Sequence, residues 1–174
     1  MPILRLRPVR AEDLPTLAQG GVGGAEDDPF QFFGHRPSNG LARHFAADGL
    51  LTDDDGMLAV ENEDATVLGS VGWHAVRHGP GDIARALNIG ITLLPEQRGR
   101  GYGTAAQEAL AHYLFQTTLV ERLEAETDVD NLAEQRALEK AAFQREGVLR
   151  HAQYRRGQWH DLILYSRLRD DPVQ

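Results

Sequence analysis

The chain has 174 residues, a formal net charge of −8 and no cysteine. Its length suits one domain with a sizeable core and is short for two. The acidic balance argues against a nucleic-acid partner, because binding to phosphate backbones depends on a basic surface. Without cysteine, disulfides, thiolate metal sites and a cysteine nucleophile are excluded. No apolar run approaches the ~20 residues of a membrane span, and no signal-peptide core is present, so we expect a cytoplasmic protein with no membrane partner.

Hydrophobic alternation and turn residues divide the N-terminal half into short elements. A first strand is predicted at 3–7 and a short helix at 12–19. The following segment, 23–37, is rich in glycine and acids, which is typical of an irregular loop. Its phenylalanines Phe30, Phe32 and Phe33 either pin the loop to the core or line a binding site. A helix at 41–48 and strands at 57–60 and 66–74 complete this half.

The stretch 86–104 carries the strongest functional signal. Apolar residues alternate from Leu87 to Leu93, which predicts a strand, and Pro95 ends it. Three glycines at alternate positions follow, and a helical run begins at Thr104. Glycine tolerates positive φ and a close ligand, and a helix start presents unpaired N–H groups, so this order of elements predicts an anion site. A loop that only turns a corner is the simpler alternative, and neither the P-loop nor the dinucleotide fingerprint fits.

The glycine loop contains Arg98-x-x-Gly101-x-Gly103. This run resembles the pyrophosphate-binding signature of the GCN5-related N-acetyltransferases, the GNAT superfamily. The resemblance implies acetyl-CoA, or another acyl-CoA, as cosubstrate and no metal. It also implies a bulged strand around Gly90 that splays from its neighbour, with pantetheine in the gap. The implied coenzyme-binding residues in this stretch are Ile91, Thr92, Leu93, Arg98, Gly99, Arg100, Gly101, Tyr102, Gly103 and Thr104.

The C-terminal part is predicted to contain a strand, a helix and a hairpin. Alternation predicts a strand at 123–129, and Asp130 or Asn131 caps a helix at 132–143. Two further strands, at 144–154 and 159–168, flank a turn and form a terminal β-hairpin.

A second motif lies on the predicted helix. Asn131-x-x-Glu134, followed by Lys140-x-Ala142-Phe143, resembles a run in the GNAT branch that acetylates ribosomal-protein N-termini and small amines. The resemblance implies that Asn131 contacts the pantetheine arm, and it adds Lys140 to the coenzyme-binding residues and Asn131 and Glu134 to the catalytic ones. Glu134 stands where serine is usual, and it needs a raised pKa to protonate the coenzyme thiolate. Ala142 stands where glycine is usual, which we interpret as a change in packing only.

The resemblance covers about 86–168 and implies an α/β (α+β) fold. We expect a single GNAT-like domain over 1–174, with a mixed, twisted sheet of about seven strands flanked by helices. Splayed strands at the coenzyme site and the terminal hairpin belong to this fold. The acceptor-side segment is expected at about 20–56 and the coenzyme-binding core at about 86–143.

Transfer of an acyl group to an amine requires a group that removes the proton of the amine. We place Asp161 first as this base, because it shares a face of the terminal hairpin with Tyr165. Tyr165 either protonates the thiolate or packs as a buried aromatic residue. His74, Glu134 and His160 are the other hypotheses for the base.

The expected function is transfer of an acetyl or acyl group from the coenzyme directly to a primary amine, in a ternary complex. The acceptor is either a protein N-terminus or a small molecule. Acidic runs such as 53–55 are either solvated loops or attract a cationic amine. The alternatives are a non-catalytic acyl-CoA-binding module with a decayed acceptor site and a general anion-binding domain. A homodimer is left open.

Overall fold

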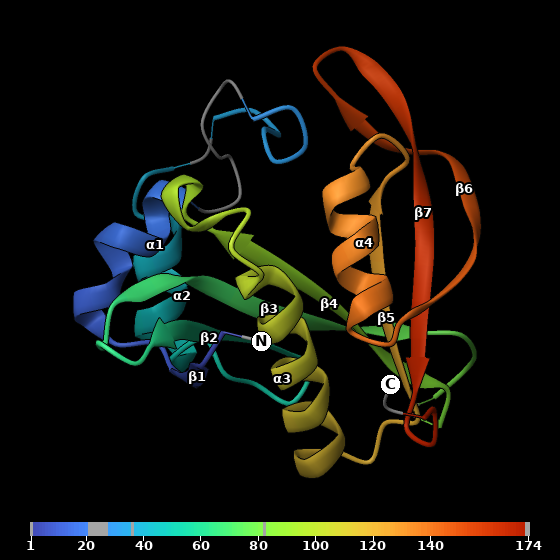
Figure 1. The fold of residues 1–174 in the computed structure, drawn as a ribbon, viewed down its shortest axis with the longest axis horizontal. Helices are drawn as coiled ribbons and strands as arrows, with labels where there is room; N and C mark the ends of the chain where they lie inside the picture. The colour runs from blue at the N-terminus through green and yellow to red at the C-terminus, as the bar shows by residue number, and fades with distance from the viewer. Residues whose placement is uncertain (1, 21–27, 36, 82, 173–174) are drawn as a thin grey trace.

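The computed structural model describes residues 2–20, 28–35, 37–81 and 83–172 (Figure 1). Seven strands form one sheet in the order β1-β2-β3-β4-β5-β7-β6, which confirms the predicted fold. The strands are β1 (Leu4–Pro8), β2 (Asp55–Asn62), β3 (Val67–Arg77), β4 (Arg85–Leu93), β5 (Arg122–Asp128), β6 (Gln144–Arg155) and β7 (Gln158–Leu168). The helices are α1 (Leu14–Gly20), α2 (Gly40–Asp48), α3 (Tyr102–Thr117) and α4 (Leu132–Lys140), with 3₁₀ turns at Ala11–Asp13 and Pro95–Gln97.

The sheet divides where β4 meets β5. These neighbours are parallel and pair only through Leu87 with Leu123 and Asn88 with Glu124; beyond these pairs the strands diverge (Figure 1). From there to its end, β4 pairs with β3 alone, so its other edge has no strand partner. The predicted splay is therefore confirmed. The prediction of a bulge at Gly90 is wrong, because the pairing of β4 with β3 continues through this residue without a shift of register.

The helices cover opposite faces of the sheet. Leu87 and Ile89 of β4 are buried in the main core with Leu110 and Leu114 of α3. A smaller cluster around Leu17 attaches α1 and α2 to the other face of the sheet. The alternation of β4 thus turns its apolar side toward α3 and leaves its polar side facing away from it. None of the described helices is long and apolar enough to cross a membrane.

The end of α4 corrects one prediction. The helix expected at 132–143 ends at Lys140, and Ala142 has a φ of +63°, in the left-handed region. The N–H groups of Ala142 and Phe143 donate back to the carbonyls of Glu139 and Leu138, as in common helix endings where glycine adopts this conformation. Alanine in this left-handed conformation has a higher backbone energy than glycine would have. The interpretation of Ala142 as a change in packing only was therefore wrong.

Candidate active site

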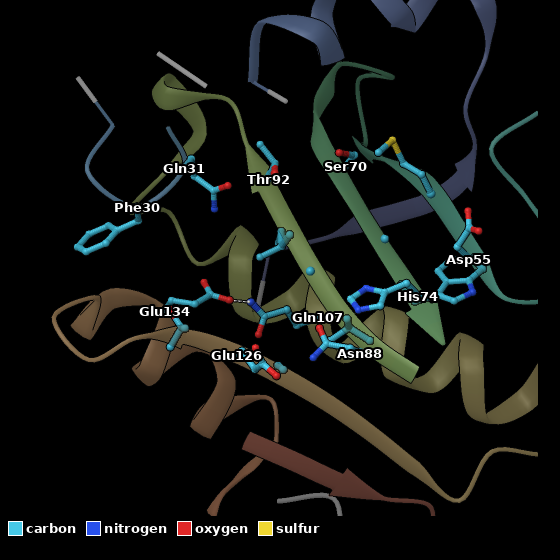
Figure 2. Close-up of a pocket in the computed structure, with 18 of the residues that line it drawn as sticks. Phe30, Gln31, Asp55, Ser70, His74, Asn88, Thr92, Gln107, Glu126 and Glu134 are labelled. Carbon is cyan, nitrogen blue, oxygen red and sulfur yellow. Dashed lines mark hydrogen bonds between the residues drawn. The ribbon is translucent and has the colours of Figure 1, made fainter. Parts of the chain in front are cut away.

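A cavity of about 480 Å³ occupies the region where β4 and β5 diverge. Figure 2 shows Gln107 and Glu134 on one side of β4 and His74 and Asp55 on the other. Gln107 and Glu134 belong to α3 and α4, whereas His74 and Asp55 lie on β3 and β2. The lining also includes Leu41 and His44 of α2, which covers the face of the sheet opposite α3, so the cavity reaches both faces through the splay.

Glu134 and Gln107 line the cavity side by side (Figure 2). Gln107 is 1% exposed, and its Nε2 donates to Glu134 Oε1 at 2.5 Å. Burial raises the pKa of the Glu134 carboxyl to about 7, and the hydrogen bond from Gln107 opposes that rise without cancelling it. The raised pKa that proton donation by this residue requires is therefore present. Gln107 also has a buried Oε1 with no hydrogen-bond partner among the described residues, so it presents an unused acceptor.

Asn131 begins α4 and lines the same cavity. Its side-chain oxygen accepts the backbone N–H of Glu134 at 3.3 Å, which is the N-cap arrangement that the sequence predicts. The cap fixes the first turn of α4 and with it the position of Glu134. Lys140, at the other end of the helix, is exposed and does not line the cavity.

The glycine loop lies between the end of β4 and the start of α3. Gly99 and Gly101 have φ values of +72° and +83°, and Gly101 is the N-cap of α3. Arg100 is exposed and forms no ion pair with any residue that the structure describes. Tyr102 packs against the core. The loop therefore combines left-handed glycines, a helix start and a solvated cation, which together suit a phosphate group.

The other predicted strand and loop residues are nearby. Ile91 and Thr92 line the cavity from β4, and Leu93 packs against the core. Gly103 and Thr104 lie in the first turn of α3. Ile91, Thr92, Asn131 and Glu134 thus line one cavity, whereas none of the predicted residues 98–104 lines it.

Asp161 and Tyr165 do not line the cavity. Asp161 accepts the backbone N–H of His151 at 2.8 Å, beside a shift of register in the β6–β7 hairpin. Tyr165 has no exposed surface, and its hydroxyl donates to Glu139 Oε1 at 3.2 Å. Burial raises the pKa of Tyr165, and the negative charge of Glu139 adds to this. His160 lies outside the cavity as well, with Nδ1 3.2 Å from Asp128 Oδ2.

Further polar side chains line the cavity from strands β2 to β5, and the sequence-based prediction considered only some of them. Asp55, His74 and Asn88 are level with one another on neighbouring strands, and Glu126 lies across the gap on β5 (Figure 2). Burial raises the pKa of Glu126, the charge of Glu124 adds to the rise, and His74 opposes it. The prediction considered His74 but missed Glu126.

A signal for Glu126 was nevertheless present in the sequence. Glu124, Glu126 and Asp128 alternate along β5 and share one face. Glu124 pairs with His78 and Arg122, and Asp128 pairs with Arg155 and His160. Of the three acids, only Glu126 has no ion pair with a residue in the described part of the chain, and it lines the cavity.

The phenylalanine segment borders the cavity instead of joining the core. Phe30 and Phe33 line the cavity, while Phe32 has the guanidinium of Arg156 5.8 Å from its ring. Arg155 approaches the ring of Phe30 at 5.9 Å and donates to the carbonyl of Pro29. Both arginines belong to the end of the β6–β7 hairpin, so this segment is attached to that hairpin. Residues 21–27, which include most of the neighbouring acidic run, lie outside the described residues.

Comparison with known proteins identifies the family. The model of the acetyltransferase (GNAT) domain matches residues 4–144. The chain therefore belongs to the GNAT acetyltransferase family, as the two motifs implied.

Individual relatives agree with this assignment. The uncharacterized N-acetyltransferase YoaA of Bacillus subtilis (strain 168) is 32% identical over 110 residues, covering 62% of this chain and 59% of that protein. This chain thus matches less than two thirds of the length of that relative. Among solved structures, RimL, a ribosomal L7/L12 alpha-N-protein acetyltransferase in complex with coenzyme A, has a TM-score of 0.81 at 22% identity, covering 97% of this chain and 96% of that one. The spermidine N-acetyltransferase of Vibrio cholerae in complex with CoA and spermine has a TM-score of 0.77 at 17% identity, covering 97% and 96%. At these identities the two likenesses are of fold.

Proposed function

We propose that this protein is an acetyl-CoA-dependent N-acetyltransferase that transfers the acyl group directly to a primary amine in a ternary complex. The observation that carries the proposal is the cavity through the splayed sheet. It is lined by Glu134 of α4, Glu126 of β5 and His74 of β3, and also by Ile91 and Thr92 of β4, the strand that leads to the glycine loop. Two substrates entering from opposite faces of the sheet would meet in this gap, as a direct transfer requires.

The residues present fit the coenzyme. The edge of β4 beyond Asn88 has backbone groups without a strand partner, which suit the amides of a pantetheine arm. The glycine loop and the first N–H groups of α3 suit the pyrophosphate. An N–H of β4 can also stabilise the oxyanion that forms on the thioester carbonyl. Asn131, Arg98 and Arg100 complete the proposed coenzyme-binding set.

Glu126 is our choice for the general base. It lines the cavity, has no ion pair within the described chain, and has a raised pKa, so its carboxylate is a better proton acceptor than an ordinary one. In the transfer, the acyl carbon forms a bond to the amine nitrogen, and Glu126 takes the proton that the nitrogen loses, directly or through water. His74 faces the same space and helps to orient the amine.

Glu134 is our choice for the general acid. The bond from the acyl carbon to sulfur breaks in the same transfer, and the leaving thiolate needs a proton. With a pKa of about 7, Glu134 is partly protonated at neutral pH and can supply it. Gln107 and the Asn131 cap hold this carboxyl in place. The sequence-based hypothesis for Asp161 and Tyr165 is less favoured, because neither side chain lines the cavity.

The acceptor is proposed to be a cationic amine. Asp55 and Glu126 line the cavity, and neither carboxylate forms an ion pair with a described residue. A surface with such carboxylates attracts ammonium groups. Both a polyamine and a protein N-terminus meet this description. The two neighbours with coenzyme bound act on one of each kind, according to their names.

The test combines coenzyme binding with amine-dependent release of thiol. Coenzyme A at a hundredfold excess over its Kd should stabilise the fold by about 2.7 kcal/mol. Acetyl-CoA with a panel of polyamines and peptide N-termini should release thiol. Glu126→Gln should lower kcat by about 10²–10⁴ while leaving the Kd of the coenzyme nearly unchanged.

Each alternative gives a different result. Coenzyme binding without thiol release for any amine would support the non-catalytic acyl-CoA-binding module. A melting temperature that millimolar coenzyme A does not change would exclude both the N-acetyltransferase and the non-catalytic binding module. Asp161→Asn serves as the matched control, and a loss of kcat in that variant but not in Glu126→Gln would return the base to Asp161.

A further inference from the structure

The segment 28–33 connects three parts of the site. Phe30 and Gln31 line the cavity near the end of β4 (Figure 2). The backbone of this segment receives hydrogen bonds from the tip of the β6–β7 hairpin, where Arg155 donates to Pro29 and Arg156 to Asp28. Its third connection leads to the glycine loop and runs through the side chain of Asp28.

Asp28 uses its two carboxylate oxygens for different purposes. Oδ1 accepts the backbone N–H groups of Phe30 at 2.9 Å and Gln31 at 3.0 Å, which fixes the turn that presents both residues to the cavity. Oδ2 accepts Nη1 of Arg98 at 2.9 Å. The Asp28 side chain is 8% exposed and that of Arg98 is 46% exposed, so the acid is fixed and the arginine is open to a ligand.

Arg98 is also the first residue of the predicted pyrophosphate signature. Its Nε donates to the carbonyl of Leu93 at 3.1 Å, which holds the side chain beside the end of β4. A carboxylate within hydrogen-bond distance lowers the positive potential that this guanidinium offers to any other anion. The diphosphate of a coenzyme at the glycine loop therefore has a competitor within the chain.

We propose that Asp28 is a positioning residue that competes with the coenzyme diphosphate for Arg98 and so couples the donor site to the acceptor segment 28–33. This inference rests on the proposed function and adds to it an interaction between the two substrate sites. Without coenzyme, Arg98 helps to hold Asp28 and the turn at Phe30 and Gln31. With coenzyme, Arg98 turns toward the diphosphate, and the segment is left attached through its hairpin contacts and its own turn.

Two substitutions at one position separate the charge from the turn. Asp28→Asn keeps an oxygen for the N–H groups of Phe30 and Gln31 and removes only the negative charge. We expect coenzyme A to bind this variant about fivefold more tightly, the effect of an exposed ion pair. The gain should shrink at about 1 M salt, where charges are screened. Asp28→Ala also removes the turn, so the KM of the amine should rise while kcat changes little.

A double-mutant cycle makes the test specific to the pair. Arg98→Gln should weaken coenzyme A binding, and adding Asp28→Asn to it should give almost no further change, because the competed cation is gone. Asp64→Asn is the charge-matched control, since Asp64 is exposed at the β2–β3 turn. Calorimetric titration with coenzyme A gives the Kd of each variant.

The outcomes distinguish this proposal from the function on which it rests. If the wild type binds coenzyme A and Asp28→Asn binds it with equal or lower affinity, Asp28 does not compete for Arg98 and only this proposal fails. An equal gain in Asp64→Asn would also overturn it, because the effect would be one of net charge. If no variant binds coenzyme A, the proposed function and this coupling both fail.

Discussion

Carboxylates of similar intrinsic acidity have three different surroundings in this protein. Glu134 lies at a buried junction of two helices with one amide donor, and its pKa rises to about 7. Asp161 accepts a backbone N–H at a strand irregularity. Glu126 faces the cavity with only His74 to oppose its raised pKa. The chemical role of each acid thus follows from its neighbours.

The raised pKa of Glu134 predicts how the stability of the coenzyme-free protein depends on pH. The folded state favours the protonated form of Glu134. Its contribution to the free energy of unfolding is therefore complete below the pKa that Glu134 has in the unfolded chain, and it is lost as the pH rises toward 7 and above. Glu134→Gln stays neutral at all pH values. We expect this variant to be close to wild type at pH 4 and more stable by about 1–3 kcal/mol at pH 8, measured by urea unfolding.

The exposed Glu63 provides the control for this experiment. Glu63→Gln changes the net charge equally but should leave the pH dependence of unfolding as in wild type. If Glu134→Gln and Glu63→Gln follow the same curve, Glu134 is an ordinary ionised carboxylate and cannot serve as the acid of the transfer.

The ends of the helices decide where functional groups lie. The Asn131 cap places Glu134 in the first turn of α4, and Gly101 begins α3 at the glycine loop. The other end of α4 depends on the left-handed Ala142. Capping conformations at three helix ends therefore control the positions of Glu134 and the glycine loop and the return of the chain to β6.

Ala142→Gly should stabilise the protein. Alanine at a φ of +63° carries a left-handed penalty that glycine does not, and the loss of chain entropy on folding offsets only part of the gain. We expect the free energy of unfolding to rise by about 1 kcal/mol in urea denaturation. Ala137→Gly, at a half-buried position in the middle of the same helix, should instead lower it by about 1 kcal/mol. A loss of stability in both variants would show that this helix end gains nothing from glycine.

Gly101→Val tests the glycine loop. A Cβ at Gly101 has room, since its nearest neighbour is Pro2 at 3.5 Å, but the φ of +83° strains any other residue. The side chain would also obstruct a phosphate bound as we propose. We expect the Kd of coenzyme A to rise about tenfold or more, beyond the effect on stability.

Gly81 offers a matched position, with a φ of +79° and open space around it, in the connection that precedes β4, whereas the glycine loop follows that strand. Gly81→Val should cost similar stability and leave the affinity for coenzyme A unchanged. Equal affinities in both variants would show that the loop at Gly101 is only a turn.

The whole molecule is a sheet of two arms that meet at the short β4–β5 pairing (Figure 1). In one arm, a buried ion network holds the edge of the sheet. Arg7 of β1 is 8% exposed and donates to Asp13 at 2.6 Å and to Glu61 of β2 at 2.5 Å. Hydrogen bonds from Arg7 hold the pKa of Asp13 below its usual range, against the effect of burial. Stability of this arm therefore depends on ionised acids.

Asp13→Asn should destabilise the protein by about 2 kcal/mol at pH 7, the contribution of a hydrogen bond between charged groups. Because the folded pKa of Asp13 is depressed, its contribution is present above the unfolded pKa of about 4 and is lost as pH falls below it. The difference from wild type should thus shrink toward pH 2 in thermal melts. Glu12→Gln, which removes an exposed pair with Arg10, should have little effect at either pH. A difference that persists at pH 2 would mean that Asp13 acts through packing.

Local patterns in the sequence predicted most of the elements. Alternation marks the strands because side chains of a strand point to opposite faces, and the glycine loop and the Asn131 cap are recognised from adjacent residues alone. The left-handed Ala142 was not foreseen, since alanine does not signal a positive φ. For the same reason the helix was expected to run three residues too far.

The choice among acids at the site depended on tertiary structure. Whether Asp161 or Glu126 faces the cavity is set by where β4 leaves β5 and by the register of the β6–β7 hairpin. The pairing of Asp28 with Arg98 joins residues 70 positions apart. The sequence determined which strands, turns and caps form, because those depend on neighbours along the chain. Only the tertiary structure decided which carboxylates are paired and which face the gap, because charge interactions and burial depend on distances in space.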